Sequence, residues 1–107
     1  MAPHVAHTRS APLNFNSSGD NVIISAPASG GIRIYALTFT VSGATQVTYK
    51  DSVAGSLSGA FRLTGDGSSM TLPMTDEPWF NIQPGSNFVM NSANAVTFGG
   101  TIWYVTG

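Results

Sequence analysis

The sequence contains no cysteine and very little charge. Its 107 residues include four lysines and arginines and five aspartates and glutamates, which together make up 8% of the chain. A typical soluble domain carries about 25%. The lack of cysteine excludes a disulfide framework, a zinc site with thiolate ligands and a cysteine nucleophile. It leaves the redox compartment open, because a chain without thiols is indifferent to it.

The low charge also excludes two kinds of partner. A formal net charge of −1 provides no electrostatic footprint for nucleic acid or for an anionic membrane surface. No apolar run approaches the roughly 20 residues that a membrane-spanning helix needs. We therefore expect neither nucleic acid nor a membrane among the partners of this protein.

Uncharged residues take the place of the missing charge. Hydrophobic residues make up 42% of the chain, and much of the rest is Ser, Thr, Asn and Gly. Copies of such a chain repel one another weakly, and charge is depleted at the centre of protein interfaces because burying an unpaired charge is costly. This composition favours a domain whose surface is covered by copies of itself or by a larger scaffold. The alternative is a neutral, Ser/Thr-rich β-domain without such contacts.

Residues 1–20 are predicted to form an extended N-terminal arm. They contain Pro3 and Pro12, show no sustained periodicity, and end in the turn-forming stretch NSSGD. Proline removes a backbone donor and biases the preceding residue toward an extended conformation. The predicted organisation is therefore an arm over residues 1–20 followed by one β-sandwich domain over residues 21–107.

From Asn21 onward, β-branched and aromatic segments alternate with Gly and Pro. The longest predicted strand is Ile32–Val41, whose sequence IRIYALTFTV is dense in residues that favour strands. A short turn at Ser42 and Gly43 and the alternating segment Thr45–Lys50 follow it. Because the connection is short and contains glycine, we predict that the two strands form a hairpin.

The pattern as a whole predicts an all-β fold. No segment keeps helical periodicity for longer than a turn. About eight short strands at this spacing indicate a single antiparallel β-sandwich or jelly-roll-like barrel. Gly99 and Gly100 are expected to separate two of these strands. The side chains expected to supply most of the core are Ile24, Ile34, Leu37, Phe39, Val47, Leu63, Leu72, Phe80, Phe88, Val96 and Trp103.

Titratable residues are too scattered to predict a catalytic site. His4 and His7, the only histidines, lie in the arm, and a zinc site would need further ligands. Apart from the neighbours Asp76 and Glu77, the acids stand singly, and nothing singles out the pair across a cleft that a glycosidase needs. We therefore predict no enzyme activity, no cofactor and no metal. A metal shared across a symmetry axis and a small hydrolase are the alternatives.

Three consecutive stretches carry a resemblance to a known class of proteins. They are GGIRIYALTFTVSGATQVTYKDS, SGAFRLTGDGSSMTLPM and EPWFNIQPGSNFVMNSANAVTFGGTIWYV. In these, the segment from Gly31 to Gly107 resembles small bacteriophage virion proteins of the β-sandwich type, particularly head decoration (cement) proteins. The resemblance implies a homo-oligomer, often a trimer, on the outer surface of the capsid, where it clamps neighbouring major capsid protein subunits.

The residues expected to contact a partner lie in the arm and in one loop. Those in the arm are His4, His7, Arg9, Leu13 and Phe15. Trp79 follows a proline in a predicted loop, and an exposed tryptophan there can anchor an interface. The alternative function is the receptor- or glycan-binding head domain of a phage tail fibre. That function predicts a surface aromatic platform, around Trp79 or Tyr104, on which sugar rings can stack.

Overall fold

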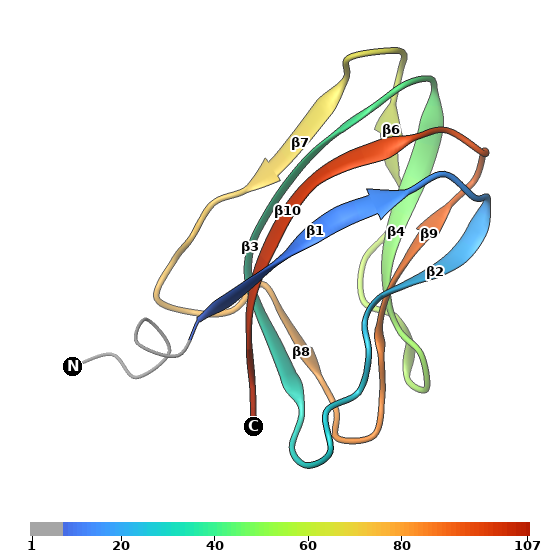
Figure 1. The fold of residues 1–107 in the computed structure, drawn as a ribbon. Coiled ribbons are helices and arrows are strands. Elements are labelled where there is room, and N and C mark those ends of the chain that lie inside the picture. Colours follow the sequence, from blue (N-terminus) through green and yellow to red (C-terminus); the bar gives the residue numbers. More distant parts are fainter. Residues whose placement is uncertain (1–7) are drawn as a thin grey trace.

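A computed structural model describes residues 8–107 of the chain. His4 and His7 lie outside the described residues. Residues 8–107 form ten β-strands and no helix. Figure 1 shows how the strands are arranged in space. In chain order the strands are β1 (Arg9–Phe15), β2 (Gly19–Ile24), β3 (Ile32–Val41), β4 (Thr45–Asp51), β5 (Gly55–Ser56), β6 (Phe61–Leu63), β7 (Ser69–Leu72), β8 (Phe80–Ile82), β9 (Phe88–Ser92) and β10 (Phe98–Thr106).

The strands form two antiparallel sheets. The first sheet has the order β1-β10-β3-β7, with β8 also paired to β3, and the second has the order β2-β9-β4-β5, with β6 also paired to β4. The pairs are nested along the chain, because β1 pairs with β10, β2 with β9, β3 with β7 and β8, and β4 with β5 and β6. This is the strand order of a jelly roll. The predicted all-β sandwich is confirmed.

The first strand lies within the part of the sequence that was assigned to the arm. Arg9–Phe15 pairs with β10 along its whole length, and the expected boundary after residue 20 falls inside β2. Leu13 points into the core and has no exposed surface. Pro12 is tolerated because β1 is an edge strand that has only β10 beside it among the described strands. The described part of the predicted arm thus belongs to the sandwich.

The predicted hairpin between Ile32–Val41 and Thr45–Lys50 is wrong. Both strands form, as β3 and β4, but they lie in different sheets. The connection between them is held by other loops, since the backbone N–H of Ser42 donates to the Thr97 carbonyl over 3.0 Å. A short connection that contains glycine can close a hairpin or cross between sheets, and local sequence does not distinguish the two.

Aromatic side chains fill much of the space between the sheets. Phe98 packs against Phe15 and Phe39, with ring centroids 4.1 and 5.3 Å apart. Tyr49 is fully buried, and its hydroxyl donates to the Met70 sulfur over 3.2 Å. Because burial disfavours the phenolate, it raises the pKa of Tyr49. Tyr49 therefore acts as a neutral core residue with one satisfied polar atom.

The expected break at Gly99 and Gly100 is also wrong, because β10 runs through both residues. A side chain at Gly100 would overlap the backbone of Thr38 and Phe39 on β3, whereas a side chain at Gly99 would meet nothing within 4 Å. Gly100 is therefore required by the close approach of a neighbouring strand, and not by a turn.

Trp103 was expected in the core and lies outside it. Side chains alternate along β10, and Ile102, which pairs with Leu37, is the fully buried neighbour that faces the core. Trp103 pairs with Ala36 and lies half-buried on the outer face of the first sheet. The register of β10 against β3 decided which of two adjacent apolar residues became the core residue.

Candidate binding sites

The described residues that were predicted to contact a partner do not form one site. Arg9 is exposed at the start of β1, Phe15 is half-buried and stacked on Phe98, and Leu13 is buried in the core. The Leu13 side chain is therefore not available for a partner. Trp79 is 42% exposed immediately before β8, and β10 and β3 separate that strand from β1.

Trp79 ends a loop, residues 73–79, that connects β7 to β8 along the same edge of β3. Its backbone N–H donates to the Ile34 carbonyl over 2.7 Å. Its indole N–H donates to the Pro73 carbonyl over 2.8 Å. The first bond attaches the end of the loop to β3, and the second ties the end of the loop to its beginning. The loop is thus fixed before any partner binds.

An apolar groove of about 320 Å³ lies beside this loop. Residues of β3, β7, β10 and the loop line it, including Ala36, Thr38, Thr71, Pro73, Met74 and Trp103. We call it the Met74 groove. Met74 is 47% exposed, and Trp103 is half-buried on the outer face of the first sheet. Large apolar side chains that remain open to solvent in this way mark interaction surfaces when they gather in one place.

The loop beside the Met74 groove also carries negative charge. Asp76 and Glu77 are both exposed. Within residues 8–107 neither carboxylate forms an ion pair, since Lys50 and Asp20 make the ion pair found there. The loop therefore presents an apolar groove and two acidic side chains that keep their charge free.

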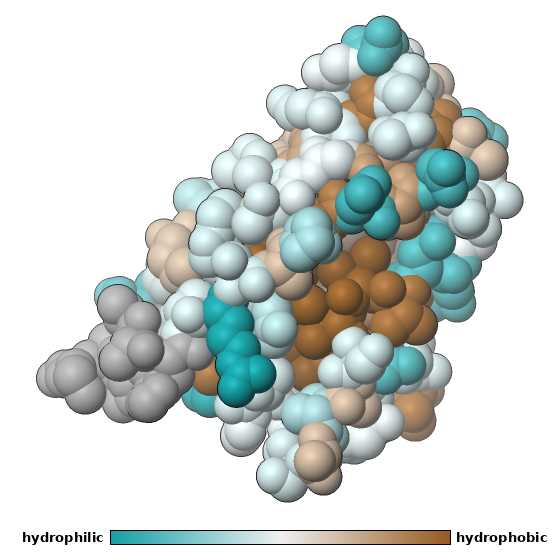
Figure 2. All heavy atoms as spheres, in the orientation of Figure 1, coloured by the Kyte–Doolittle hydropathy of each residue, from teal (hydrophilic) through white to brown (hydrophobic). Residues whose placement is uncertain are grey.

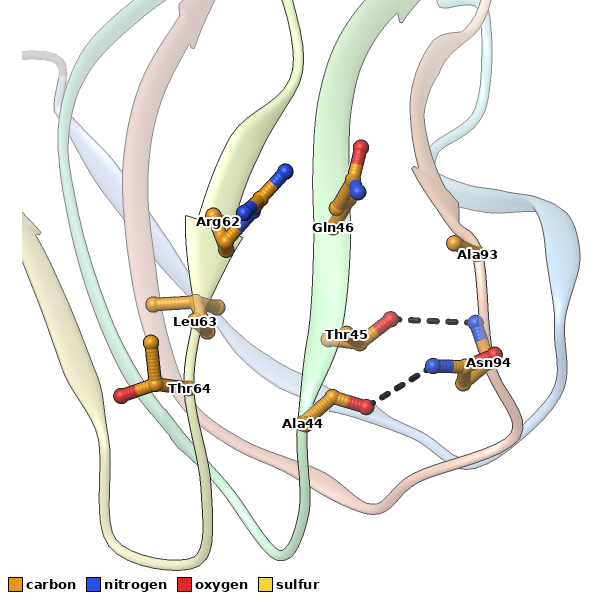
Figure 3. Close-up of a pocket in the computed structure, with 8 residues that line it drawn as sticks. All are labelled: Ala44, Thr45, Gln46, Arg62, Leu63, Thr64, Ala93 and Asn94. Atoms are coloured by element: carbon orange, nitrogen blue, oxygen red, sulfur yellow. Dashed lines mark hydrogen bonds between the residues drawn. The ribbon is translucent and has the colours of Figure 1, made fainter.

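A second hollow, of about 440 Å³, lies over the second sheet where β6 meets β4 (Figure 3). Arg62 of β6 and Gln46 of β4 are register partners, both exposed. Figure 3 shows their side chains next to each other and directed the same way. Their strand neighbours Leu63 and Val47 face the core. We call this site the Arg62 hollow.

The opposite rim of the Arg62 hollow is built from the loop after β9. The side-chain amide of Asn94 donates to the Ala44 carbonyl over 3.0 Å, and its backbone N–H donates to the Thr45 hydroxyl oxygen over 3.0 Å. Thr45 is buried and also shares a hydrogen bond with the Ser92 hydroxyl over 2.8 Å. The rim is thus held by neutral groups.

The opposite end of β4 is organised around a carboxylate. Asp51 is 2% exposed, and its oxygens accept the backbone N–H groups of Val53 and Ala54 over 2.9 Å each and of Gln83 over 3.1 Å. Burial by itself would raise the pKa of Asp51. The hydrogen bonds that Ala54, Val53 and Gln83 donate outweigh that effect and hold the pKa below 3.8.

A second carboxylate, that of Asp20, forms an ion pair with Lys50, the only lysine of the sequence. Lys50 approaches Asp20 to 3.1 Å on the outer face of the second sheet, and the Asn91 side-chain amide donates to Asp20 over 2.7 Å. The hydrogen bond from Asn91, followed by that from Lys50, lowers the pKa of Asp20. Lys50 is therefore engaged within the sheet surface, in contrast to Arg62.

Residues 8–107 contain no group of three or more His, Cys, Asp or Glu side chains placed to hold a metal ion. In the same part of the chain no helix is long and apolar enough to cross a membrane. Comparison of the sequence with protein-family models and with curated proteins finds no match.

Sequence reasoning singled out Trp79 but neither Met74 nor Arg62. For Arg62 a signal existed, because Leu63 was expected in the core and its neighbour along the strand must then face outward. For Met74 no local signal existed. Its groove depends on Trp103 of β10, which is brought beside it only by the pairing of β10 and β7 with β3.

Proposed function

We propose that this protein is a structural component of a bacteriophage head. In this proposal it is a decoration, or cement, protein that acts on the outer surface of the capsid as a homo-oligomer, with a trimer as the expected form. It binds neighbouring subunits of the major capsid protein and holds them together, and it catalyses no reaction. The resemblance in the sequence, the 8% charge fraction and the all-β sandwich support this function.

The observation that carries the proposal is the Met74 groove with its preformed loop. A loop already fixed by its own hydrogen bonds loses little conformational freedom on binding. The groove accepts an apolar side chain of a capsid subunit, and the uncompensated charges of Asp76 and Glu77 favour a lysine or arginine next to that side chain. The partner segment is therefore expected to pair an apolar residue with a basic one.

Multivalency would supply the clamping strength. A symmetric oligomer presents one Met74 groove per copy, so that binding of a second groove to a neighbouring capsid subunit becomes an intramolecular step. Modest single contacts can then give a stable attachment. Contacts that are mainly apolar also depend little on ionic strength, because salt screens charge pairs and not apolar packing.

The test is binding to phage heads that lack this protein, measured by co-sedimentation. Met74→Asp should weaken binding by about ten-fold or more, because it places an unpaired carboxylate in an apolar contact. Val53→Asp is the matched control, since Val53 is 69% exposed in a different loop, and it should bind like the wild type. Equal binding of both variants would exclude the groove as the docking surface, and failure of the wild type to bind heads would refute the function.

The candidates outside the described residues have a separate test. Deleting residues 1–7 removes His4 and His7 and leaves β1 complete. If these residues hold a capsid subunit, as proposed, head occupancy falls while the melting temperature of the isolated protein stays unchanged. Unaltered occupancy would confine the contact to the sandwich.

A further inference from the structure

The Arg62 hollow has the size and the polar groups of a small-ligand site. Its volume of about 440 Å³ lies within the range of about 300–1,000 Å³ that is common for ligand pockets. The hollow is open, and the strands β4 and β6 form its base. A ligand would therefore lie across the outer face of the sheet, with one side remaining in solvent.

The positive charge in the hollow belongs to Arg62, and no acidic side chain of the fold pairs with it within residues 8–107. Among residues 8–107, Arg62 has no ion pair, whereas Lys50 is paired with Asp20. The guanidinium group presents a planar fork of N–H donors, which matches the two oxygens of a carboxylate. The Gln46 amide lies next to it and makes no side-chain hydrogen bond within the described residues. The Arg62 guanidinium, which can bind one carboxylate, and the neutral Gln46 amide therefore lie side by side.

The far rim adds one acceptor that is already in place, on Asn94. The Asn94 amide nitrogen is engaged by the Ala44 carbonyl, and this bond fixes the orientation of the side chain. Its amide oxygen makes no hydrogen bond within residues 8–107 and is available to accept one from a hydroxyl group. Because the rim is ordered before binding, little entropy is lost when a ligand arrives.

We propose that the Arg62 hollow binds an acidic sugar, with the sugar carboxylate on Arg62 and its hydroxyl groups on Gln46 and Asn94. A single cation matches one negative charge, and neutral amides match hydroxyl groups, which both donate and accept. The lining contains no aromatic ring, so the polar groups of Arg62, Gln46 and Asn94 would carry the recognition of the ligand. This site is separate from the Met74 groove, which lies on the other sheet.

The test is titration of the ¹⁵N-labelled protein with sodium glucuronate, followed by amide chemical shifts. Saturable shifts are expected at Gln46, Arg62 and Asn94. Arg62→Gln should weaken binding by about ten-fold or more, because it removes the charged donor. Arg33→Gln is the matched control, since Arg33 belongs to β3 of the other sheet, and it should leave the affinity unchanged.

Two further ligands identify the chemistry. Glucose, which lacks the carboxylate, should bind at least about ten-fold more weakly than glucuronate, because the charged hydrogen bonds are lost. An acetylated, amidated Glu-containing tetrapeptide should bind more weakly as well. Tighter binding of the peptide would overturn the assignment to a sugar. An absence of saturable shifts with glucuronate, shifts confined to other regions, or unchanged affinity of Arg62→Gln would overturn the site. None of these outcomes bears on capsid binding.

Discussion

The two ends of strand β4 are tied to their surroundings in different ways. The C-terminal end of β4 is its lower end in Figure 1. There the buried carboxylate of Asp51 accepts hydrogen bonds from backbone N–H groups of the loop after β4 and of Gln83. At the upper end, the neutral hydroxyl of Thr45 accepts a hydrogen bond from the Asn94 backbone N–H and shares one with the Ser92 hydroxyl. Both ends join segments that are far apart in the sequence.

The comparison shows how the few charges of this chain are divided between structure and surface. The Asp51 carboxylate is surrounded by hydrogen-bond donors of the protein, so its charge serves to hold the fold together. At the upper end, neutral groups make the hydrogen bonds. The charge of Arg62 has no ion-pair partner within residues 8–107, and it faces solvent. A charge that the fold does not need is available to a ligand. Where so few residues are charged, this distinction is a useful guide to sites.

The largest expected effect on stability is at the lower end of β4, where Asp51 lies. Asp51→Asn should lower the free energy of unfolding by about 2–3 kcal/mol, because it removes a charged acceptor and turns an amide N–H₂ toward a buried backbone donor. Urea unfolding followed by circular dichroism measures this change. A loss below about 0.5 kcal/mol would show that the Asp51 network is not what holds this end.

The pH dependence of stability should differ between the wild type and this variant. The folded-state pKa of Asp51 lies below 3.8, so its contribution is complete above about pH 5 and is lost as the pH falls through that folded value. The wild type should therefore lose more stability than Asp51→Asn between about pH 5 and pH 2. Asp20 titrates in both proteins, so the difference isolates Asp51. Parallel curves would contradict the assignment.

The smallest expected effect is at the upper end. Thr45→Val keeps the shape of the side chain and removes the hydroxyl, which leaves the Asn94 N–H without its acceptor. The expected cost is about 1–2 kcal/mol, and it should not change between pH 5 and pH 2, because none of the groups hydrogen-bonded at Thr45, Ser92 and Asn94 is ionisable. A pH-dependent cost would show that the two ends are coupled. Thermal unfolding at the two pH values is the measurement.

Much of the secondary structure could be predicted from the sequence, and the pairing of strands could not. Ile32–Val41 is β3 with the predicted bounds, because a dense run of β-branched and aromatic residues between turn residues has few other structures available. The same local pattern suggested a hairpin with Thr45–Lys50 that does not exist. Hydrogen-bond partners are chosen between segments far apart in the chain, which no local window contains.

The candidate sites were harder to foresee than the strands. Trp79 was singled out because it follows a proline in a predicted loop, and the structure leaves it 42% exposed. Leu13 was expected on the surface of an arm and is buried, because the pairing of β1 with β10 carries it into the core. The Met74 groove exists only because β3 brings Trp103 of β10 and the 73–79 loop together.

The sequence alone determined that the chain folds as an antiparallel β-sandwich with few charges and without cysteine. Composition and periodicity are local properties, and they restrict each segment to strand or turn. Only the tertiary structure decided that β1 belongs to the sandwich, that Gly100 lies within a strand and that Trp103 faces outward. These outcomes depend on register, and a shift of one residue exchanges the buried and exposed faces of a strand. Register is set by the packing of the whole sandwich.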